Sequence, residues 1–429
     1  MRENLPFLNE SRLLIAISGG LDSVVLTHLC YQLNLNIALV HCNFNLRGKE
    51  SDADEDFVLQ LAEDLDLEVF IESFDTKNYS SANKLSTQMA ARKLRYDWFE
   101  ELAEQLQFDY ILTAHHADDN LETFLINLSR GTGLDGLTGI PAVNNHIIRP
   151  LLPFSREVIE TYAKENHLKW QEDSSNASTK YLRNKLRHDV IPVLKEINPQ
   201  LLQNFQNTLK NLNDTADIVE ESVAAVLNRA IKTIDKHQTV FKVSEFKKLK
   251  NPKAYLFEAL KAYGFTEWND IVSLLDAQSG KQIRSSTHRL IKDREHILLS
   301  GIDSGTDEEL ITISETDTQV KTGLGLLFFD EADAITVKNN HTIYVDKSTL
   351  TYPLTVRKWK DGDLFFPIGM SGKKKLSKYF KDEKLSLLDK EKVRLLCSGE
   401  DVVWVLGKRA DNRFRVHEKT KHILKVELK

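Results

Sequence analysis

Hydrophobic residues in the first part of the chain form short unbroken runs, separated by longer stretches of mixed polarity. Unbroken runs bounded by glycine or polar residues are typical of strands buried on both faces. They occupy residues 13–18, 36–42, 68–74 and 109–114. Helical patterns lie between them, at residues 22–33, 50–65, 82–106 and 118–130. This alternation predicts an α/β fold with a doubly wound parallel sheet, whose ligands bind beyond the carboxyl ends of the strands.

The pattern changes twice further along the chain. Asn198-Pro199 is typical of a helix cap followed by proline, and apolar residues then alternate spacings of three and four as far as Ala230. This predicts one long amphipathic helix, with further helices at 252–262 and 267–277. From about residue 306, runs rich in β-branched and aromatic residues predict strands. We therefore expect three domains: an α/β domain at 1–195, a helical middle domain at 196–305 and a small, mostly β domain at 306–429.

Composition narrows the class of protein. The chain has 429 residues, of which 41% are hydrophobic and 28% charged, as expected of a globular protein with more than one core. Cys30, Cys42 and Cys397 form neither a CxxC pair nor a disulfide framework, which favours a reducing compartment, and we expect a cytoplasmic location. Neither a signal peptide nor an apolar run near the roughly 20 residues of a membrane helix is expected. The net charge of −6 leaves polyanion binding to local clusters.

The first expected strand ends in a glycine turn, Ser18-Gly19-Gly20-Leu21-Asp22-Ser23, and a helix follows. A turn of this kind presents backbone N–H groups at a helix N-terminus, which favours phosphate. The Walker lysine is absent, and Asp22 stands where it would repel phosphate unless a cation such as Mg²⁺ lies between them. The sequence predicts a triphosphate site of a different design, against the bland alternative that Asp22 only caps the helix.

A second polar cluster, TAHHADDNLET, occupies residues 113–123. Asp119 and Glu122 are three residues apart, so both lie on one helix face near its start. Four explanations stay open on the pattern alone: a metal site with His115 and His116, acids that complement the helix dipole, a site for a cationic substrate, or a general base.

Several segments together carry a family resemblance. The turn S-G-G-L-D-S resembles the signature of the PP-loop ATP pyrophosphatases, which have a Rossmann-like fold. The run AHHADDNLET, followed by LSRGTG, is similar to the tRNA(Ile)-lysidine synthetases, a subfamily of that group. Residues 90–99, 149–162, 170–192 and 356–380 resemble further segments of the subfamily, and the likeness is weakest over 200–350. One position departs from the pattern, since Phe44 stands where the family usually has a second histidine.

The resemblance implies an ATP-dependent ligase. Such enzymes adenylate C2 of the wobble cytidine in the CAU anticodon of tRNA(Ile), and the ε-amine of free L-lysine then displaces AMP. By this resemblance the ATP-binding residues are Ser18, Gly19, Gly20, Leu21, Asp22, Ser23 and His41, with Asp22 also holding Mg²⁺. Lysine is held by Asp119, Glu122 and Arg92, and the catalytic residues are Asp22, Asp119, Glu122 and Arg92. Arg95 and Arg130 are further candidates for phosphate or carboxylate contact, and a second copy of the chain is a candidate partner because the family is commonly dimeric.

Basic clusters are the candidate tRNA contacts, because local charge rather than net charge attracts a polyanion. The predicted residues are Arg183, Lys185 and Arg187, next to Lys180, and Lys373, Lys374 and Lys375. Each cluster also has a bland interpretation as a solvated face. Two rival functions are a PP-loop tRNA-base thiolase, which would typically use paired cysteines, and a non-catalytic RNA-binding protein.

Overall fold

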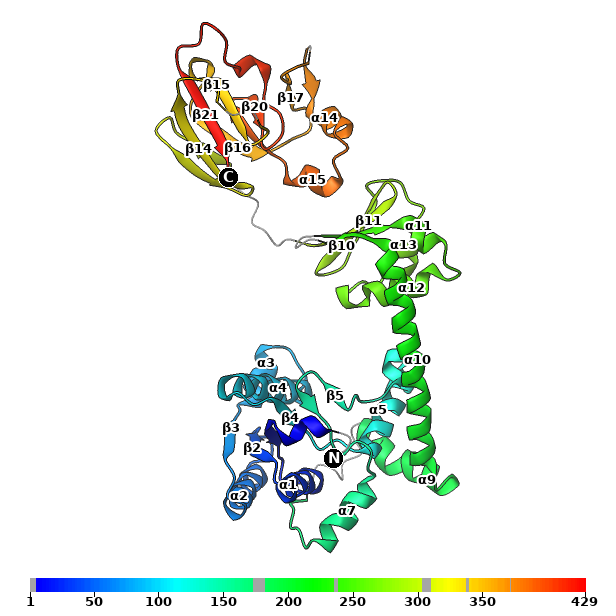
Figure 1. Cartoon of the computed structure of the whole chain (residues 1–429). Coiled ribbons are helices and arrows are strands. Elements are labelled where there is room, and N and C mark those ends of the chain that lie inside the picture. The colour runs from blue at the N-terminus through cyan, green and yellow to red at the C-terminus, as the bar shows by residue number, and fades with distance from the viewer. Residues whose placement is uncertain (1–4, 173–181, 235–237, 303–309, 337–338, 371) are drawn as a thin grey trace. The chain divides into compact units, whose positions relative to one another are not determined.

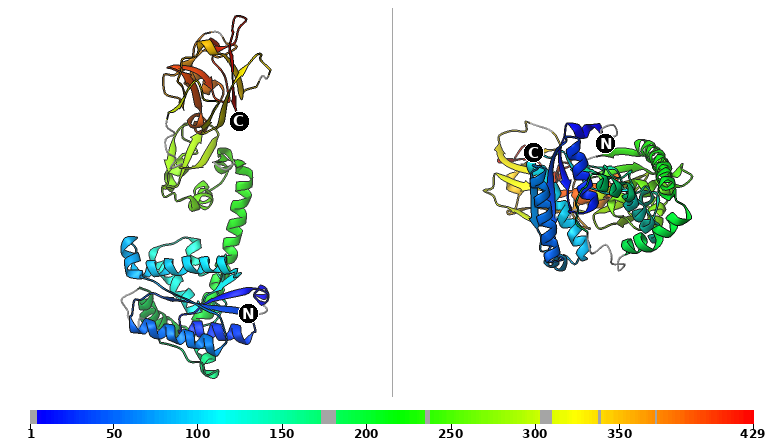
Figure 2. Two further views of the ribbon diagram at one scale, coloured as in Figure 1. Left: turned by 90° about the vertical axis from the view of Figure 1, so that its left-hand side faces the viewer. Right: turned by 90° about the horizontal axis from the view of Figure 1, so that it is seen from below.

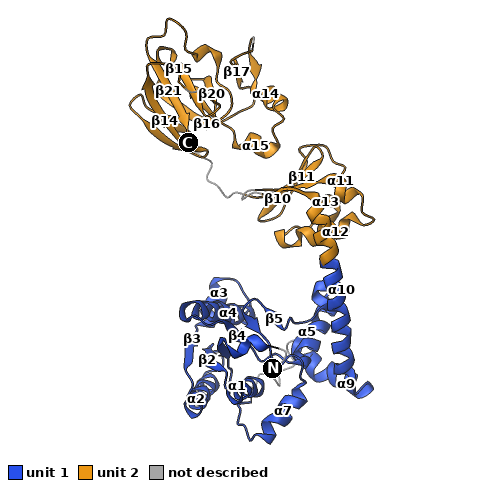
Figure 3. Ribbon diagram, viewed as in Figure 1, with its two compact units in different colours: residues 1–220 blue, residues 221–429 orange. Residues whose placement is uncertain are grey.

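The structure of the chain is a computed structural model that describes residues 5–172, 182–234, 238–302, 310–336, 339–370 and 372–429. The chain divides into two compact units, residues 1–220 and 221–429 (Figure 3). This division falls within helix α10 (Leu201–Ala230), inside the predicted middle domain. The three-domain scheme therefore stays a prediction, and each unit is described by itself.

The first unit is built on a six-stranded sheet with the order β3-β2-β1-β4-β6-β5 (Figure 1). The pairs β3-β2, β2-β1, β1-β4 and β4-β6 are parallel, and β5 runs antiparallel to β6. The strands are β1 (Arg12–Ala16), β2 (Asn36–Asn43), β3 (Val69–Ser73), β4 (Tyr110–Leu112), β5 (Val143–Asn144) and β6 (Ile147–Ile148). The predicted parallel sheet and its four strands are confirmed, but β3, at the edge of the sheet, is only half-buried and ends in exposed residues rather than being buried as predicted. The short pair β5–β6 was not predicted.

Strand β1 shows why the sheet is covered on both faces. Its side chains alternate between the faces, so Leu13 and Ile15 join one hydrophobic cluster and Leu14 joins another. The first cluster includes residues of α1 (Leu21–Gln32), α2 (Lys49–Asp64) and α7 (Arg156–Glu165). The second includes Phe99 and Ala103 of α4 (Thr87–Leu106). Figure 2 shows these helices on opposite sides of the sheet, which makes the fold doubly wound as predicted.

Two predicted helices differ from the structure at their starts. The helix predicted at 82–106 begins only at Thr87, as α4, and a separate helix, α3 (Thr76–Ala82), ends where it was expected to start. The two are separated because Lys84 takes a left-handed conformation with φ of 53°. Ser86 then caps α4, where its hydroxyl accepts a hydrogen bond from the backbone N–H of Met89. Asn198 ends α9 (Ile191–Ile197) rather than capping α10, which begins at Leu201.

Helices α5, α9 and α10 share a small core of their own. α5 (Ala117–Arg130) follows β4, and its Leu121 packs with Ile191 of α9 and with Phe205 and Leu209 of α10. Among the described residues between α5 and α9, the helical segments besides α7 are α6 (Leu134–Leu137), α8 (Leu182–Lys185) and a single π-helical turn (Leu186–Val190). This arrangement brings the segment 182–190 alongside α5, which carries the second polar cluster.

The second unit begins with the end of α10 and a five-stranded sheet of order β7-β8-β11-β10-β9. Its helices confirm the helical middle of the chain, whereas the sheet that shares their core was not predicted. The helices are α11 (Val243–Lys247), α12 (Pro252–Leu260) and α13 (Trp268–Ser273). The strands are β7 (Ile231–Ile234), β8 (Gln238–Lys242), β9 (Gln282–Arg284), β10 (His288–Asp293) and β11 (His296–Gly301).

The C-terminal part of this unit is mostly β, as predicted. Two four-stranded sheets, β12-β16-β19-β20 and β13-β14-β21-β15, share one hydrophobic core that contains the fully buried Trp404. Their strands are β12 (Ile311–Ile313), β13 (Gln319–Thr322), β14 (Gly325–Ala332), β15 (Thr342–Asp346), β16 (Leu354–Lys358), β19 (Arg394–Ser398), β20 (Asp401–Val405) and β21 (Ile423–Leu428). A second core includes residues of the β17–β18 hairpin and helix α14, and α15 lies just beyond them in the chain: β17 (Leu364–Phe365), β18 (Lys374–Lys375), α14 (Leu376–Asp382) and α15 (Leu387–Lys392).

Short 3₁₀ turns lie at Pro6–Asn9, Lys261–Tyr263, Lys347–Thr349 and Asn412–Phe414. Across the described ranges, none of the helices combines the length and the apolar character that crossing a membrane requires.

Candidate active site

The glycine turn connects β1 to α1 and is held by two serine hydroxyls. The N–H of Ser18 donates to Oγ of Ser23 at 3.2 Å, and the N–H of Gly20 donates to Oγ of Ser18 at 3.3 Å. Gly19 has φ of 82°, and a Cβ there would come within 3.3 Å of the Phe57 ring. Glycine is therefore required at this position, and the turn leaves the first N–H groups of α1 without helical partners. The predicted strand–turn–helix unit is confirmed.

His41 and Leu21 support the turn from behind. His41 is buried on β2, and its Nδ1 lies 2.9 Å from the carbonyl oxygen of Ile17, so this nitrogen carries the proton. Burial lowers the pKa of His41, so the ring is neutral at pH 7. The side chain of Leu21 packs into the core of the sheet, so its backbone N–H is the group it can offer a ligand.

Asp22, at the start of α1, has a hydrogen bond on only one of its two carboxylate oxygens. Its Oδ2 accepts a hydrogen bond from Arg156 at 3.1 Å and lies 3.7 Å from Nε2 of His116. Its Oδ1 is buried and has no hydrogen-bond partner. Burial raises the pKa of Asp22, against the lowering effect of His116 and Arg156. An unsatisfied buried acceptor of this kind marks a position at which a further positive ligand would be stabilising.

The unpaired Oδ1 of Asp22 allows us to ask whether the site fits a magnesium ion. Mg²⁺ prefers oxygen ligands and is usually held by one or two carboxylates together with phosphate oxygens and water. The carboxylate beside the glycine turn fits that requirement. Within the described ranges, no group of three or more His, Cys, Asp or Glu residues is arranged to hold a metal, which gives no support to the alternative of a protein-only metal site at His115 and His116.

The second polar cluster forms the first turn of α5, and one histidine joins it to the glycine turn. His116 caps α5: its Nδ1 accepts from the N–H of Asp119, and its own N–H donates to Oδ2 of Asp119. The other ring nitrogen of His116 lies 3.4 Å from Asp119 Oδ2 and 3.7 Å from Asp22 Oδ2. The capping role considered for the acids is thus real for Asp119, and the same ring brings two distant sequence motifs together.

Glu122 lies one turn further along α5 and is only 1% exposed. Its carboxylate receives Arg187 on both oxygens, at 2.6 and 3.0 Å, and Nε of Arg183 lies 3.1 Å from Oε2. Arg187 also donates to Asp119 Oδ1 at 3.1 Å. Burial raises the pKa of Glu122, although its hydrogen bonds with Arg187 act in the opposite direction. Asp119 and Glu122 form a paired carboxylate site, and two arginines neutralise it in this structure.

Asp118 is the third acid of the cluster and has a structural task. Its Oδ2 accepts the N–H of Arg156 at 2.9 Å, and its Oδ1 accepts from Lys195 at 2.5 Å. These hydrogen bonds lower the pKa of Asp118 even though burial alone would raise it. Asp118 therefore ties α5 to the start of α7 and to the last turn of α9, and so it positions Arg156 for its contact with Asp22.

Three arginines lie near enough to His115 to affect its pKa. Burial lowers the pKa of His115 to about 4, and the nearby charges of Arg149, Arg183 and Arg92 act in the same direction. Arg149 is 6% exposed, donates to the carbonyl of Pro141 at 2.7 Å and has a buried Nε without a hydrogen-bond partner. The predicted residue Arg92 is exposed on α4. Arg92, Arg149 and Arg183 therefore give the surroundings of His115 a positive charge.

Arg149 and Arg156 are functional candidates to which sequence reasoning gave no role. Both lie in the segment 149–162, which resembles the family, and that resemblance was the available signal. Arg95 contacts Phe44, with its guanidinium 5.1 Å from the ring centroid, and Phe44 also stacks on Phe74. The aromatic residue at position 44 therefore contributes packing where the family usually has a histidine.

The structure separates the predicted tRNA contacts into two kinds. Arg183 and Arg187 face the acid pair, whereas Lys185, Lys373 and Lys375 are exposed. Lys374 pairs with Asp382 at 2.7 Å. The aromatic residues beside the second cluster, Tyr379 and Phe380, belong to the core. Lys180 lies outside the described residues, and Arg130, at the end of α5, is exposed.

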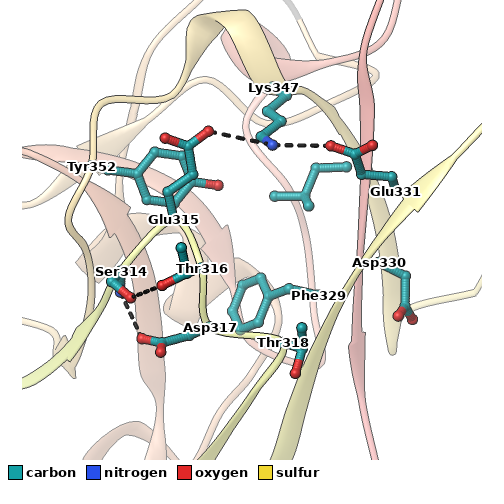
Figure 4. Close-up of a pocket in the computed structure, with 11 residues that line it drawn as sticks. Ser314, Glu315, Thr316, Asp317, Thr318, Phe329, Asp330, Glu331, Lys347 and Tyr352 are labelled. Atoms are coloured by element: carbon teal, nitrogen blue, oxygen red, sulfur yellow. Dashed lines mark hydrogen bonds and ion pairs between the residues drawn. The ribbon is translucent and has the colours of Figure 1, made fainter.

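A separate cavity of about 280 Å³ lies in the C-terminal part of the second unit (Figure 4). Lys347 bridges Glu315 and Glu331 across it, at 3.3 and 3.0 Å. Both glutamates are largely exposed, so this bridge is a surface ion pair of small energy. None of the predicted site residues lines this cavity.

Comparison with known proteins gives three family matches along the chain. Residues 2–194 match the PP-loop domain, 234–302 the TilS substrate binding domain and 354–428 the TilS substrate C-terminal domain. The tRNA(Ile)-lysidine synthase of Parabacteroides distasonis is 40% identical over 99% of this chain and 97% of its own length. That of Bacteroides thetaiotaomicron is 38% identical over 97% of this chain and 95% of its own length. Among solved structures, the U34-tRNA thiolase NcsA of Methanococcus maripaludis aligns at 20% identity and a TM-score of 0.40, covering 49% of this chain and 76% of that one.

Proposed function

The chain belongs to the tRNA(Ile)-lysidine synthase family, and from this premise we propose how its site carries out the reaction. Its function is that of an ATP-dependent ligase that modifies tRNA(Ile). We propose that the turn Ser18–Ser23 binds the phosphates of ATP and that Asp119 and Glu122 bind the amine of free L-lysine. The observation that carries this proposal is the His116 ring, which lies within 3.7 Å of both Asp22 and Asp119 and so places the two sites side by side.

The first half-reaction needs negative charge to be stabilised as pyrophosphate leaves. The cytidine O2 attacks the α-phosphorus, and the bond from that phosphorus to the bridging oxygen breaks. The N–H groups at the start of α1 are the donors that would stabilise this charge. Arg156 is a second donor at this place, because it contacts Asp22 and can offer its planar guanidinium group to phosphate. Asp22 would hold Mg²⁺, which when bound supplies further positive charge against the phosphates.

The second half-reaction needs an amine that has lost its proton. Free lysine has a reference pKa of about 10.4, so it arrives as an ammonium and cannot attack until a base takes a proton. Asp119 is committed to capping α5, whereas Glu122 is buried and its pKa is raised. We therefore assign proton acceptance to Glu122 and orientation of the amine to Asp119. Arg92 and Arg149, on the other side of His115, suit the α-carboxylate of the same lysine.

The cysteines argue against the thiolase alternative. Cys30 and Cys397 are fully buried, and burial raises the pKa of Cys42 on β2 to about 12. Sulfur transfer needs a thiolate, which forms at an exposed cysteine with a lowered pKa. A homodimer and a cytoplasmic location stay predictions, and light scattering of the purified chain tests the first.

The experiment for the ATP site replaces Asp22 with Asn. We expect tRNA-dependent exchange of labelled pyrophosphate into ATP to fall by at least about 100-fold, because the carboxylate proposed to hold Mg²⁺ against the phosphates is lost. The melting temperature should stay equal or rise, because burial raises the pKa of Asp22, which means that the charged carboxylate is disfavoured there, and the amide carries no charge. Asp118→Asn is the matched control, since it should lower the melting temperature and keep measurable exchange. Unchanged exchange in the Asp22 variant would contradict the proposal.

A further inference from the structure

The acid pair assigned to lysine is already filled by a residue of the chain itself. Arg187 makes a two-pronged contact with both oxygens of Glu122 and a third hydrogen bond with Asp119, and Nε of Arg183 lies 3.1 Å from Oε2, one of the same two oxygens. Glu122 is 1% exposed, so no amine can reach it while both arginines stay in place. Building on the proposed function, we propose that Arg187, supported by Arg183, occupies the lysine site until a phosphate group draws it away, so that lysine binds after the phosphate ligand.

Charge balance explains why the arginines and lysine compete. Asp22, Asp119 and Glu122 contribute three negative charges to the site, and Arg156, Arg183 and Arg187 contribute three positive ones. A lysine ammonium that entered this neutral cluster would place a second cation beside Glu122 in a poorly solvated position. Two like charges at one buried carboxylate are unfavourable, so one of them must leave or be neutralised by a new anion.

The two arginines are more exposed than the carboxylate that they contact, so a phosphate group can reach them from solvent. The side chain of Arg187 is 25% exposed and that of Arg183 is 43% exposed, whereas that of Glu122 is 1% exposed. An incoming anion therefore meets the guanidinium groups before it meets the carboxylate. Arginine binds phosphate through the same pair of parallel hydrogen bonds that it makes with a carboxylate, so the exchange replaces one strong contact with another.

The backbone that carries the two arginines is irregular. Arg183 lies on α8, which has four residues, and Arg187 lies on the single π-helical turn Leu186–Val190. A π-helical turn is rare and is found frequently at functional sites. Lys185 is exposed on the same segment, so the outer side of 183–187 is positive. The phosphate belongs either to the tRNA backbone or to ATP, and the experiment below separates these sources.

The test measures lysine binding by calorimetry to the full-length chain. Four samples are compared: the protein alone, with an ATP analogue that cannot be cleaved between its α and β phosphates, with a tRNA(Ile) transcript, and with both. We expect the Kd of lysine to fall by at least about tenfold in an arm that contains the responsible phosphate, which lies within the usual range of coupling between two sites. By linkage, lysine must tighten binding of that ligand by the same factor. An equal Kd in all four arms would overturn the proposal.

Variants of Arg187 separate an occupant from a supporting residue. Arg187→Gln should bind lysine more tightly than the wild type when no phosphate ligand is present, and the response to phosphate should disappear. If Arg187 merely supports Glu122, the same variant binds lysine more weakly, and the proposal is wrong. Arg187→Lys keeps the charge but loses the two-pronged contact, so its Kd for lysine should lie between those of the wild type and Arg187→Gln. If circular dichroism shows that Arg187→Gln is unfolded, Arg187→Lys takes its place in the test.

The control is Lys195→Gln, which removes a cation that pairs with Asp118 rather than with Glu122. Its lysine Kd should keep the wild-type response to phosphate. Failure of this proposal is distinct from failure of the proposed function. A wild-type enzyme that forms the lysine-modified nucleoside without any coupling overturns only the occupancy of the site by Arg187, whereas an enzyme that forms no such product overturns the function as well.

Discussion

Replacing Glu122 with Gln removes one of the two negative charges of the acid pair and keeps the shape of the side chain. Glu122 carries the two-pronged contact of Arg187, with distances of 2.6 and 3.0 Å, and is 1% exposed. Hydrogen bonds to charged groups contribute about 1.5–3 kcal/mol each, and a tenfold change in affinity corresponds to about 1.4 kcal/mol. If the lysine amine makes one such contact with Glu122, the variant should raise the KM for lysine by about 10- to 150-fold.

The same substitution should change stability far less than a fully buried ion pair would. Breaking such a pair usually costs about 3–5 kcal/mol, because a charge is left buried. Here the side chain of Arg187 is 25% exposed and keeps its 3.1 Å contact with Asp119, and that of Arg183 is 43% exposed. Both can be rehydrated, so we expect the free energy of unfolding to fall by about 1–2 kcal/mol.

The assay is steady-state formation of AMP with tRNA(Ile), with lysine and ATP varied separately. Glu122→Gln should raise the KM for lysine and leave the KM for ATP within about twofold, whereas Asp118→Asn should leave the KM for lysine unchanged. If the KM values for lysine and ATP rise together in the Glu122 variant, the residue supports the site as a whole, and our assignment of a direct contact with the amine is refuted.

Three further predictions follow from other parts of the chain. Replacing Lys373, Lys374 and Lys375 with Ala should weaken tRNA binding and reduce the slope of log affinity against log salt by about two, because Lys374 already pairs with Asp382; an unaltered slope returns the cluster to ordinary surface. Stability should fall as the pH drops from 6.5 towards 4, since the pKa of His115 is lowered to about 4 by burial and the unfolded chain takes up a proton first. His115→Gln should reduce that loss of stability, which is at most about 3 kcal/mol, when urea unfolding is measured at pH 7 and at pH 4.5. An identical loss in the wild type and the variant would mean that other groups cause it. Arg156→Gln should raise the KM for ATP by about tenfold and spare that for lysine, because Arg156 contacts Asp22 and not Glu122, and a shift confined to lysine would contradict the assignment of Arg156 to phosphate.

The parts of the fold that could be predicted from sequence are those in which each local pattern agrees with its tertiary surroundings. In β1, consecutive apolar residues reflect burial on both faces, and Gly19 marks a left-handed turn that few other residues tolerate. The break between α3 and α4 gave only a weak signal, because Lys84 adopts its left-handed conformation without glycine. The sheet of the middle segment was missed because its strands are short and lie among helices that dominate the periodicity.

The candidate site shows the same limit for side chains. Asp22, Asp119 and Glu122 could be found from their motifs, yet no pattern indicated that the ring of His116 joins them. Arg183 and Arg187 were predicted as tRNA contacts because they are basic and close to each other in the sequence. The structure instead places both against Glu122, some sixty residues earlier in the chain, and such a pairing depends on how α5 and the segment 182–190 pack. Sequence alone gives the charge of a residue but not its partner.

The central claim is that this site activates the wobble cytidine with ATP and then joins it to lysine. The most direct measurement is the mass of the anticodon nucleoside after tRNA(Ile) is incubated with the wild-type chain, ATP, Mg²⁺ and isotope-labelled lysine. We predict a nucleoside with the mass of cytidine plus labelled lysine less one water, formed together with one AMP and one pyrophosphate. An unmodified cytidine, or a modified one that carries no label, would contradict the account.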